Sequence, residues 1–291
     1  MRQLLSKTLI FCHMIKLEHS LFALPFAYLG LFLGADGWPG GAVFFWVTLA
    51  MVSFRTLGMG LNRLIDKAID AANPRTQGRA LPAGRLKNSF VITASVVSFF
   101  IFECSAYQLN SLCFQLSWAP VLLAILYPWL KRFTWFSHFV LGLILGIAPY
   151  GAWLASQPFF SWIPGLLTLG VTAWVAGFDI IYALQDEAFD RQTGLFSFPV
   201  RFGVEKSLIL TRCLHGVALM AWFAAGAMAG LGSVFVVGVI LVAFLLIREN
   251  WLIKTRGLAK VQEAFFTMNA MVSFALFAFV LADLALRGGM R

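Results

Sequence analysis

The sequence predicts an all-α protein that crosses a membrane many times. Its 291 residues are 60% hydrophobic and only 12% charged. Its mean hydropathy is +0.83. The apolar residues form repeated runs of about 20, the length that a helix needs to cross a hydrocarbon core, where every backbone polar group must be satisfied internally. No soluble globule of this length needs so much apolar surface, so we predict a polytopic membrane protein.

Nine apolar segments have the length and composition of membrane-spanning helices. Short polar or glycine-containing connections separate them, and the longest connections follow the second and sixth segments. We expect the nine spans at roughly 20–35, 42–62, 88–108, 112–130, 136–155, 162–184, 208–229, 231–248 and 264–286.

The basic residues are distributed unevenly among the connections. Of the 22 Lys and Arg, 20 lie in the N-terminal segment, in or after the second span, or at and after the ends of spans four, six and eight, where Arg212 is counted although it falls in the first turns of span seven; the other two are Arg287 and Arg291. The connections after spans one, three, five and seven contain none. Because positive charge marks the cytoplasmic side, we expect an inner-membrane protein with its N-terminus in the cytoplasm and its C-terminus outside. The net charge of +9 then reflects topology and contact with membrane lipid rather than nucleic acid.

The first acidic motif stands at the end of the second span. It reads "NRLIDKAID", with Asn62, Asp66 and Asp70 spaced four residues apart. At about 100° per residue, these three side chains fall within an arc of about 80° on a helix. Arg55, seven residues before Asn62, falls on the same stripe.

The second acidic motif stands at the end of the sixth span. In "DIIYALQDEAFDRQTG", the residues Asp179, Tyr182, Asp186 and Asp190 also fall within about 80° if the segment is one helix. Both motifs are expected on the cytoplasmic side, and both precede long loops. Two carboxylate faces at the same depth can meet across one cavity.

Carboxylates repeated in this way need a positive partner, because nearby like charges disfavour ionisation. An isolated Asp at a helix end is commonly a solvated terminus, but two such faces in a chain with only 13 acidic residues favour a site. Few Lys or Arg fall on these two helical arcs, so we expect divalent cations to be the positive partner of the carboxylates. Oxygen ligands without Cys or His favour Mg²⁺, which binds jointly with substrate phosphates. The residues therefore predict a diphosphate held between two metal-loaded helices, with the active site cytoplasmic.

These motifs resemble those of the UbiA superfamily of membrane prenyltransferases, which carry NDxxDxxxD after the second helix and DxxxD after the sixth. Here the corresponding stretches are "NRLIDKAID" with "NPRTQGRALPAG", and "DIIYALQDEAFDRQTGLFSFPVRFG". The resemblance covers essentially the whole chain, including "YPWLKRFTWFSHFVLGLILGIAP". It implies a single domain, 1–291, of nine helices around a central cavity. "EHSLFALPFAYLG" and the NPRTQGRALPAG loop are most similar to the branch that serves menaquinone synthesis through futalosine, with the 4-hydroxybenzoate branch of ubiquinone synthesis as its neighbour.

The resemblance also implies a reaction: transfer of a polyprenyl group from an isoprenyl diphosphate to an aromatic acid. Asn62, Asp66 and Asp70 would hold one Mg²⁺, Asp186 and Asp190 a second, and Asp179 would support them. One residue departs from the family pattern, since Arg63 replaces the usual Asp. Its direction on the helix differs from that of Asn62 by about 100°, so we expect a second-tier position, where the change leaves the metal site intact but can alter diphosphate contacts.

Several cations and one aromatic residue are further candidates for binding substrate. Arginine suits bidentate grips on phosphate or carboxylate, although each cation can also be a simple marker of the cytoplasmic side. Arg55 is unusual because a charge inside a span is costly and commonly functional. His19 is a candidate for approaching the acceptor, and we expect His215 to be a hydrogen-bonded structural residue. The proposed substrate-binding residues are Arg55, Asn62, Arg75, Arg79, Lys131, Asp179, Tyr182 and Arg201.

Two other functions fit parts of this pattern. A cation-coupled secondary transporter would also use membrane aspartates, but transporters place them near the midplane rather than at helix ends. A CDP-alcohol phosphotransferase would be membrane-bound and Mg²⁺-dependent, but its compact DGxxAR…GxxxDxxxD element is absent. The sequence leaves open the isoprenoid length, the aromatic acceptor and the oligomeric state.

Overall fold

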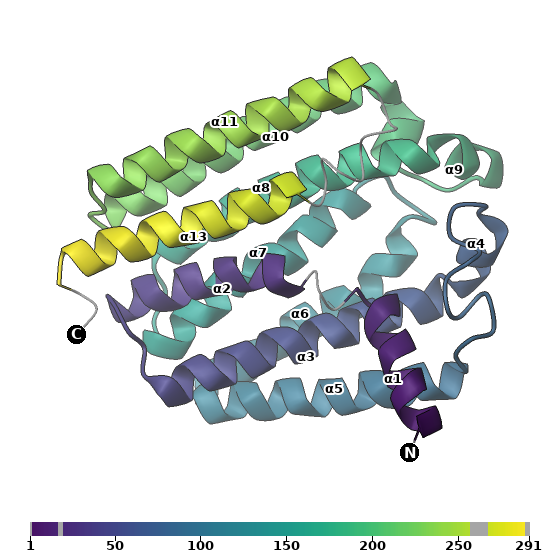
Figure 1. Ribbon diagram of the computed structural model, residues 1–291, viewed down its shortest axis with the longest axis horizontal. Coiled ribbons are helices and arrows are strands. Elements are labelled where there is room, and N and C mark those ends of the chain that lie inside the picture. The colour runs from purple at the N-terminus through teal and green to yellow at the C-terminus, as the bar shows by residue number, and fades with distance from the viewer. Residues whose placement is uncertain (1, 17–19, 257–266, 289–291) are drawn as a thin grey trace. The chain divides into compact units, whose positions relative to one another are not determined.

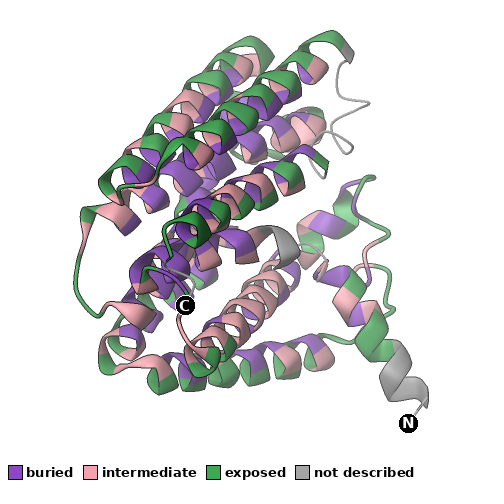
Figure 2. Ribbon diagram, turned by 60° about the vertical axis from the view of Figure 1, so that its left-hand side comes forward, coloured by how far each residue is buried: buried purple, intermediate pink, exposed green. Residues whose placement is uncertain are grey.

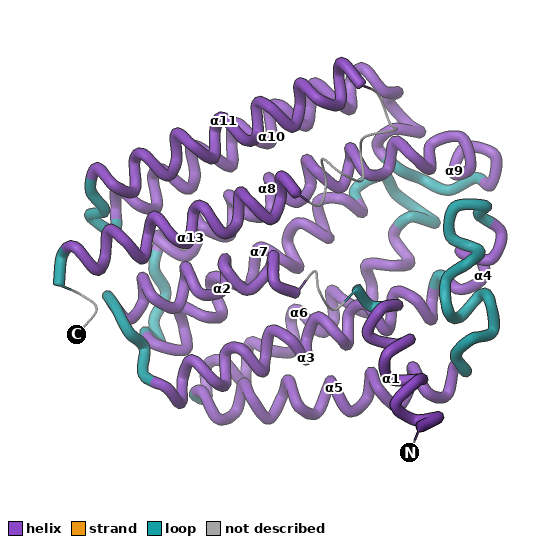
Figure 3. Tube along the Cα trace, in the orientation of Figure 1, coloured by secondary structure: helices purple, strands orange, loops and turns teal. Residues whose placement is uncertain are grey.

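A computed structural model of the protein describes residues 2–16, 20–256 and 267–288. Within these ranges every regular element is helical (Figure 3), which confirms the predicted all-α class. The helices are α1 (Arg2–Met14), α2 (Ser20–Ala35), α3 (Gly41–Ile65), α4 (Lys67–Ala72), α5 (Asn88–Leu109), α6 (Ser111–Leu130), α7 (Ser137–Ser156), α8 (Trp162–Ala183), the 3₁₀ turn η2 (Leu184–Asp186), α9 (Glu187–Thr193), α10 (Phe198–Met228), α11 (Ser233–Arg256) and α13 (Asn269–Leu286).

The long helices correspond to the predicted spans. In the part of the chain that the structure describes, 8 helices are long and apolar enough to cross a membrane, and a shorter apolar helix covers Ala23–Ala35. The seventh predicted span is the least accurate, because α10 begins at Phe198 rather than near residue 208. The extra turns precede and include Gly203, whose φ of 82° interrupts the helical backbone and is a conformation that glycine adopts without strain.

The chain divides into two compact units. The first consists of Met1–Leu21 and Phe45–Trp129, and the second of Phe22–Phe44 and Leu130–Arg291. The first acidic motif therefore lies in the first unit and the second acidic motif in the second.

In the first unit, α3 runs beside α5 (Figure 1). The two helices approach closely at Gly60, where an added Cβ would collide with the hydroxyl of Ser95. Small residues at such crossings let membrane helices pack by close van der Waals contact. A separate apolar cluster joins α1 to the loop after α4 and to the start of α5, and it consists of Phe11, Met14, Ile15, Ala80, Leu81, Leu86 and Val91.

In the second unit, α8 packs against both α7 and α10. Buried residues, coloured purple in Figure 2, make up most of the second half of α8 and include Val175 and Ala176 at 0% exposure. Glycines allow the close crossings: a Cβ on Gly142 of α7 would collide with the carbonyl oxygen of Thr172, and one on Gly170 with the Trp222 indole. This packing makes α8 the central helix of the unit and fixes its end, where the second motif begins.

The last three helices of the second unit are joined by polar contacts as well as apolar ones. The carboxylate of Asp283 in α13 accepts hydrogen bonds from the backbone N–H groups of Gly232 and Phe235, at 3.0 and 3.1 Å. These are two of the otherwise unsatisfied donors at the start of α11. His215 of α10 meets Asn250 of α11, with 3.0 Å between Nδ1 and Nδ2. The expectation that His215 is a hydrogen-bonded structural residue is confirmed.

Candidate active site

The first motif keeps its helical spacing through a break between two helices. Asp66 stands between α3 and α4, yet its N–H donates to the carbonyl of Asn62 at 3.0 Å, and the N–H of Asp70 donates to the carbonyl of Asp66 at 2.8 Å. The amide Nδ2 of Asn62 donates to Oδ2 of Asp66 at 3.2 Å. The three predicted ligands therefore stay one turn apart, and the side chains of Asn62 and Asp66 touch.

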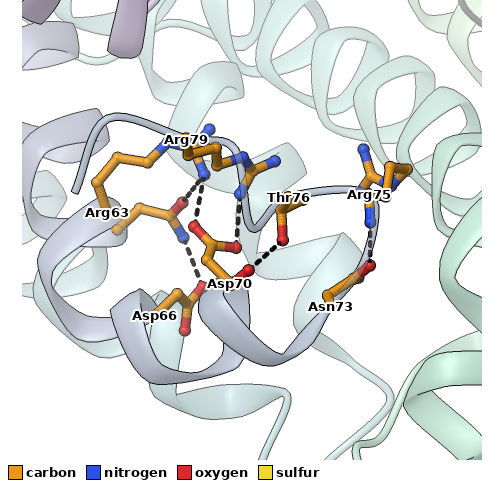
Figure 4. A network of polar contacts seen from close by, with 8 residues as sticks. Arg63, Asp66, Asp70, Asn73, Arg75, Thr76 and Arg79 are labelled. Carbon is orange, nitrogen blue, oxygen red and sulfur yellow. Dashed lines mark hydrogen bonds and ion pairs between the residues drawn. The ribbon is translucent and has the colours of Figure 1, made fainter. Parts of the chain in front are cut away.

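Asp70 is held by two arginines (Figure 4). Nη1 of Arg79 donates to Oδ1 of Asp70 at 2.7 Å. Nη1 of Arg63 lies 3.6 Å from Oδ2 of Asp70 and donates to Oδ1 of Asn62 at 3.3 Å. Only 8% of Arg63, 3% of Asp66 and 5% of Asp70 is exposed. The motif is thus a buried cluster with two carboxylates and two guanidinium groups.

Arg63 lies close to the predicted ligands. We expected a second-tier position because its Cα–Cβ bond points about 100° away from that of Asn62. The side chain is long enough to curve around the helix, and its guanidinium reaches both Asn62 and Asp70. The interpretation that the acidic arc carries few cations fails for the same reason.

The loop after α4 is folded so that Arg79 returns to Asp70. The hydroxyl of Thr76 donates to the carbonyl of Asp70 at 3.0 Å, and the N–H of Arg79 donates to the carbonyl of Thr76 at 2.9 Å. The next two residues, Ala80 and Leu81, are 4% and 1% exposed and belong to the apolar cluster with α1. Burial of these two residues anchors the loop, and the anchor fixes the position of Arg79.

The second motif is not one continuous helix. α8 ends at Ala183, a 3₁₀ turn covers Leu184–Asp186, and α9 begins at Glu187. The assumption of a single helix over 179–190 was therefore wrong, although Asp186 and Asp190 remain four residues apart and half-buried. Gly194 ends α9 with a φ of 71°, the left-handed conformation that commonly terminates helices.

Asp179 has a partner that the sequence did not reveal. Nδ1 of His138, in the first turn of α7, lies 2.7 Å from Oδ2 of Asp179. The backbone N–H of Phe198 donates to Nε2 of the same ring at 3.3 Å. Since that nitrogen accepts, the proton of the neutral ring is on Nδ1 and is donated to Asp179. His138 is 4% exposed and ties together the start of α7, the end of α8 and the start of α10.

The remaining candidates have varied surroundings. Tyr182 packs against a buried pair formed by Ile181 and Ile253. The carbonyl of Lys131 accepts a 2.7 Å hydrogen bond from the N–H of Phe196, which brings the loop after α6 to the loop after α9. Arg75 and Arg201 are exposed, Arg55 is half-buried within α3, and His19 lies outside the described residues.

The donor set of the first motif fits Mg²⁺. Within the described ranges, no three His, Cys, Asp or Glu side chains are close enough to hold a metal ion by themselves. Mg²⁺, however, commonly binds one or two carboxylates together with water and substrate phosphates. Asp66 and Asp70, with the amide oxygen of Asn62, provide such a set in a buried place.

Comparison with known proteins identifies the family. The model of the UbiA prenyltransferase family matches residues 23–277. The 4-hydroxybenzoate octaprenyltransferase of Alkalilimnicola ehrlichii is 31% identical over 259 residues, which cover 89% of this chain and 88% of that protein. The apo structure of a UbiA homolog from Aeropyrum pernix K1 has a TM-score of 0.84 and 31% identity, and the match covers 92% of this chain and 98% of that one.

A more distant structure has the same fold. A UbiA homolog from Archaeoglobus fulgidus, bound to DMAPP and Mg²⁺, has a TM-score of 0.73 and 17% identity, over 95% of this chain and 99% of that one. The family match begins in α2 and ends in α13, so it includes both acidic motifs and the helices that carry them. The protein is therefore a multi-pass membrane protein of the UbiA prenyltransferase family.

Proposed function

We propose that the protein transfers a polyprenyl group from an isoprenyl diphosphate to an aromatic acid, with Mg²⁺ as cofactor and release of diphosphate. The observation that carries this proposal is the cluster of Asn62, Asp66 and Asp70 at the end of a membrane helix, in which both aspartates are buried and Arg79 is paired to Asp70. Oxygen ligands for a divalent cation and a guanidinium for phosphate stand side by side there, next to an apolar span in which a prenyl chain is soluble.

The relatives favour 4-hydroxybenzoate as the acceptor. Proteins named 4-hydroxybenzoate octaprenyltransferase match most of this chain at about the same identity as the solved archaeal homolog. A dihydroxynaphthoate is the second candidate, because the N-terminal "EHSLFALPFAYLG" and the NPRTQGRALPAG loop resemble the menaquinone branch. Either ring is electron-rich and carries a carboxylate that an arginine can grip.

The proposed reaction breaks the allylic C–O bond and forms a bond between that carbon and the ring, which then loses a proton. Asn62, Asp66 and Asp70 would hold one Mg²⁺ and Asp186 with Asp190 a second. Bound Mg²⁺ would neutralise the negative charge that the departing diphosphate gains, an effect larger in the transition state than in the ground state.

The chain's own residues provide the remaining parts of the reaction. Arg79, which the loop anchored by Ala80 and Leu81 holds beside Asp70, would bind a phosphate oxygen, and Arg75, Lys131 and Arg201 are candidates for further phosphate contacts. Arg55 is a candidate for the acceptor's carboxylate. Asp179, oriented by His138, would support the second acidic motif, and Tyr182 would lie near the developing allylic cation.

We further propose that residues 1–291 act as a single functional domain. The uneven distribution of Lys and Arg supports an inner-membrane location with the N-terminus and the active site cytoplasmic and the C-terminus outside. The transporter alternative is not supported, because the family match and the named relatives are prenyltransferases.

A product assay tests the proposal. Purified protein in detergent is given geranyl, farnesyl or octaprenyl diphosphate with Mg²⁺ and either 4-hydroxybenzoate or a dihydroxynaphthoate. We expect prenylated acid by mass spectrometry together with one diphosphate per product, and loss of both when EDTA removes the metal. Binding of a prenyl diphosphate without product from either acceptor would contradict the proposed acceptor class. Solute uptake into liposomes without diphosphate release would contradict the enzyme assignment.

A further inference from the structure

Arg63 stands where it holds two predicted metal ligands at once. Its Nη1 donates to Oδ1 of Asn62 at 3.3 Å and lies 3.6 Å from Oδ2 of Asp70. A single positive group thus lies between the amide oxygen of one ligand and the carboxylate oxygen of another (Figure 4 shows it with Asp70). Asn62 and Asp70 are oxygen ligands about two helical turns apart, which a bound cation would draw together.

The cluster holds charges of both signs. Asp66 and Asp70 contribute two negative charges, and Arg63 and Arg79 contribute two positive ones. Each oxygen of Asp70 faces a different guanidinium, Oδ1 facing Arg79 and Oδ2 facing Arg63. A divalent cation that approached Asp70 alone would have to displace one arginine or lie beside it. In a buried place the repulsion between the metal cation and the guanidinium group is only weakly screened.

The two arginines are held with different strength. The contact between Arg79 and Asp70 is a 2.7 Å hydrogen-bonded ion pair, whereas the contact between Arg63 and Asp70 is an ion pair at 3.6 Å, and the hydrogen bond of Arg63 goes to Asn62. Arg63 is therefore the partner that leaves Asp70 more easily. A diphosphate offers more negative charge than a carboxylate and a geometry that suits guanidinium.

We propose that Arg63 occupies the place of a cation in the first motif and keeps it closed to a divalent metal until a diphosphate arrives. The diphosphate draws Arg63 from Asp70, and the released carboxylate then binds the metal. Metal and diphosphate consequently bind cooperatively, each raising the affinity for the other by the same factor. This inference rests on the proposed function, because it assumes a diphosphate substrate at this motif.

The test measures metal binding directly, with Mn²⁺ followed by electron paramagnetic resonance in detergent. Titrations are run with and without inorganic pyrophosphate, and the complex that the two form in solution is measured separately. In the unaltered protein we expect weak binding of Mn²⁺ alone and tightening by about 10-fold or more with pyrophosphate, within the usual range of coupling between sites.

Substitution of Arg63 should uncouple the two ligands. Arg63→Ala should tighten Mn²⁺ binding without pyrophosphate by about 5-fold or more and reduce the coupling to about 2-fold or less. Arg63→Asp exchanges a positive for a negative charge and should tighten Mn²⁺ binding further. Arg63→Lys keeps the positive charge and should retain part of the coupling between Mn²⁺ and pyrophosphate. Arg85→Ala is the matched control. Arg85 is an exposed arginine of the loop after α4, and it donates to the carbonyl of Gly78 at 2.6 Å. We expect this variant to bind Mn²⁺ and pyrophosphate like the unaltered protein.

The outcomes separate this inference from the proposed function. If Arg63→Ala and Arg63→Asp bind Mn²⁺ like the unaltered protein while pyrophosphate still tightens binding, Arg63 does not close the site, although the diphosphate site stands. If the unaltered protein binds no Mn²⁺ even with pyrophosphate, the proposed metal function itself fails. Should Arg63→Ala not fold, the graded result from Arg63→Lys decides, because unchanged coupling in that variant contradicts the proposal.

Discussion

Nδ1 of His138 lies 2.7 Å from the carboxylate of Asp179, and Nε2 of the same ring accepts the N–H of Phe198. One imidazole therefore connects Asp179, the first residue of the second acidic motif, with α10, the helix that follows the motif. Residues that orient the ligands of a site in this way affect activity without touching substrate.

Replacing His138 should lower turnover more than substrate affinity. His138→Ala leaves the Phe198 N–H and the Asp179 carboxylate without their partner, which costs about 1–3 kcal/mol of stability. We expect kcat to fall about 10-fold or more with KM for prenyl diphosphate changed little. Steady-state kinetics and tryptophan-fluorescence melting measure both effects. His138→Gln, which can donate and accept, should recover part of kcat, and His13→Ala on the exposed part of α1 is the control. A fall in melting temperature with kcat unchanged would make His138 purely structural.

Removing one carboxylate from either acidic motif should abolish turnover. Asp66→Ala and Asp186→Ala each delete a proposed metal ligand, so we expect kcat to fall more than about 100-fold, as for other groups that stabilise transition-state charge. Membrane expression should stay near normal. Glu187→Ala is the control next to Asp186, because Glu187 forms an ion pair with the exposed Arg191 and such pairs contribute little. Near-normal rates in either aspartate variant would contradict the metal assignment.

Arg79→Ala should weaken binding of the prenyl diphosphate. The change removes a guanidinium that the loop holds 2.7 Å from Asp70 and that we assign to phosphate. We expect KM for the diphosphate to rise about 10-fold, equivalent to about 1.4 kcal/mol, and KM for the acceptor to stay within about 2-fold of normal, a difference of under about 0.5 kcal/mol. Arg79→Lys should be intermediate, since it keeps the charge but loses the fork. Equal effects on both substrates would instead indicate a general disturbance of the loop.

The crossing of α7 and α8 should be sensitive to a single methyl group. A Cβ on Gly142 would collide with the carbonyl oxygen of Thr172, whereas one on Gly151 of the same helix meets nothing within 4 Å. Overpacking of this kind costs about 1–3 kcal/mol. We therefore expect Gly142→Ala to melt at a clearly lower temperature than Gly151→Ala in the same detergent. Identical melting curves would show that α7 and α8 can move slightly apart at this crossing without loss of stability.

The sequence predicted the membrane helices well because their signal is local. A run of apolar residues must be helical in lipid, whatever surrounds it, so the long spans were predicted without knowledge of their neighbours. The end of α8 was predicted less well. A 3₁₀ turn at Leu184–Asp186 differs from an α-helix in that each backbone hydrogen bond joins residues three rather than four positions apart, and composition does not distinguish the two.

Contacts that depend on tertiary structure could not be predicted from the sequence. His138 and Asp179 are separated by 41 positions, and no pattern in the chain links them. The contacts of Arg63 with Asn62 and Asp70 could not be predicted from its place on the helix, because backbone periodicity fixes a Cβ direction and not the end of a long side chain. The spacing of Asn62, Asp66 and Asp70 was predicted correctly since i and i+4 contacts follow from helix geometry alone.

The cluster that joins Phe11 and Met14 of α1, and Ile15 just after it, to Leu81 of the loop after α4 has a practical consequence for handling the protein. A purification tag or fluorescent fusion at the amino end would attach a bulky group to α1, the helix against which that loop packs. Preparations labelled at opposite ends should then differ in specific activity, and a handle placed after α13 is the better choice for enzymology.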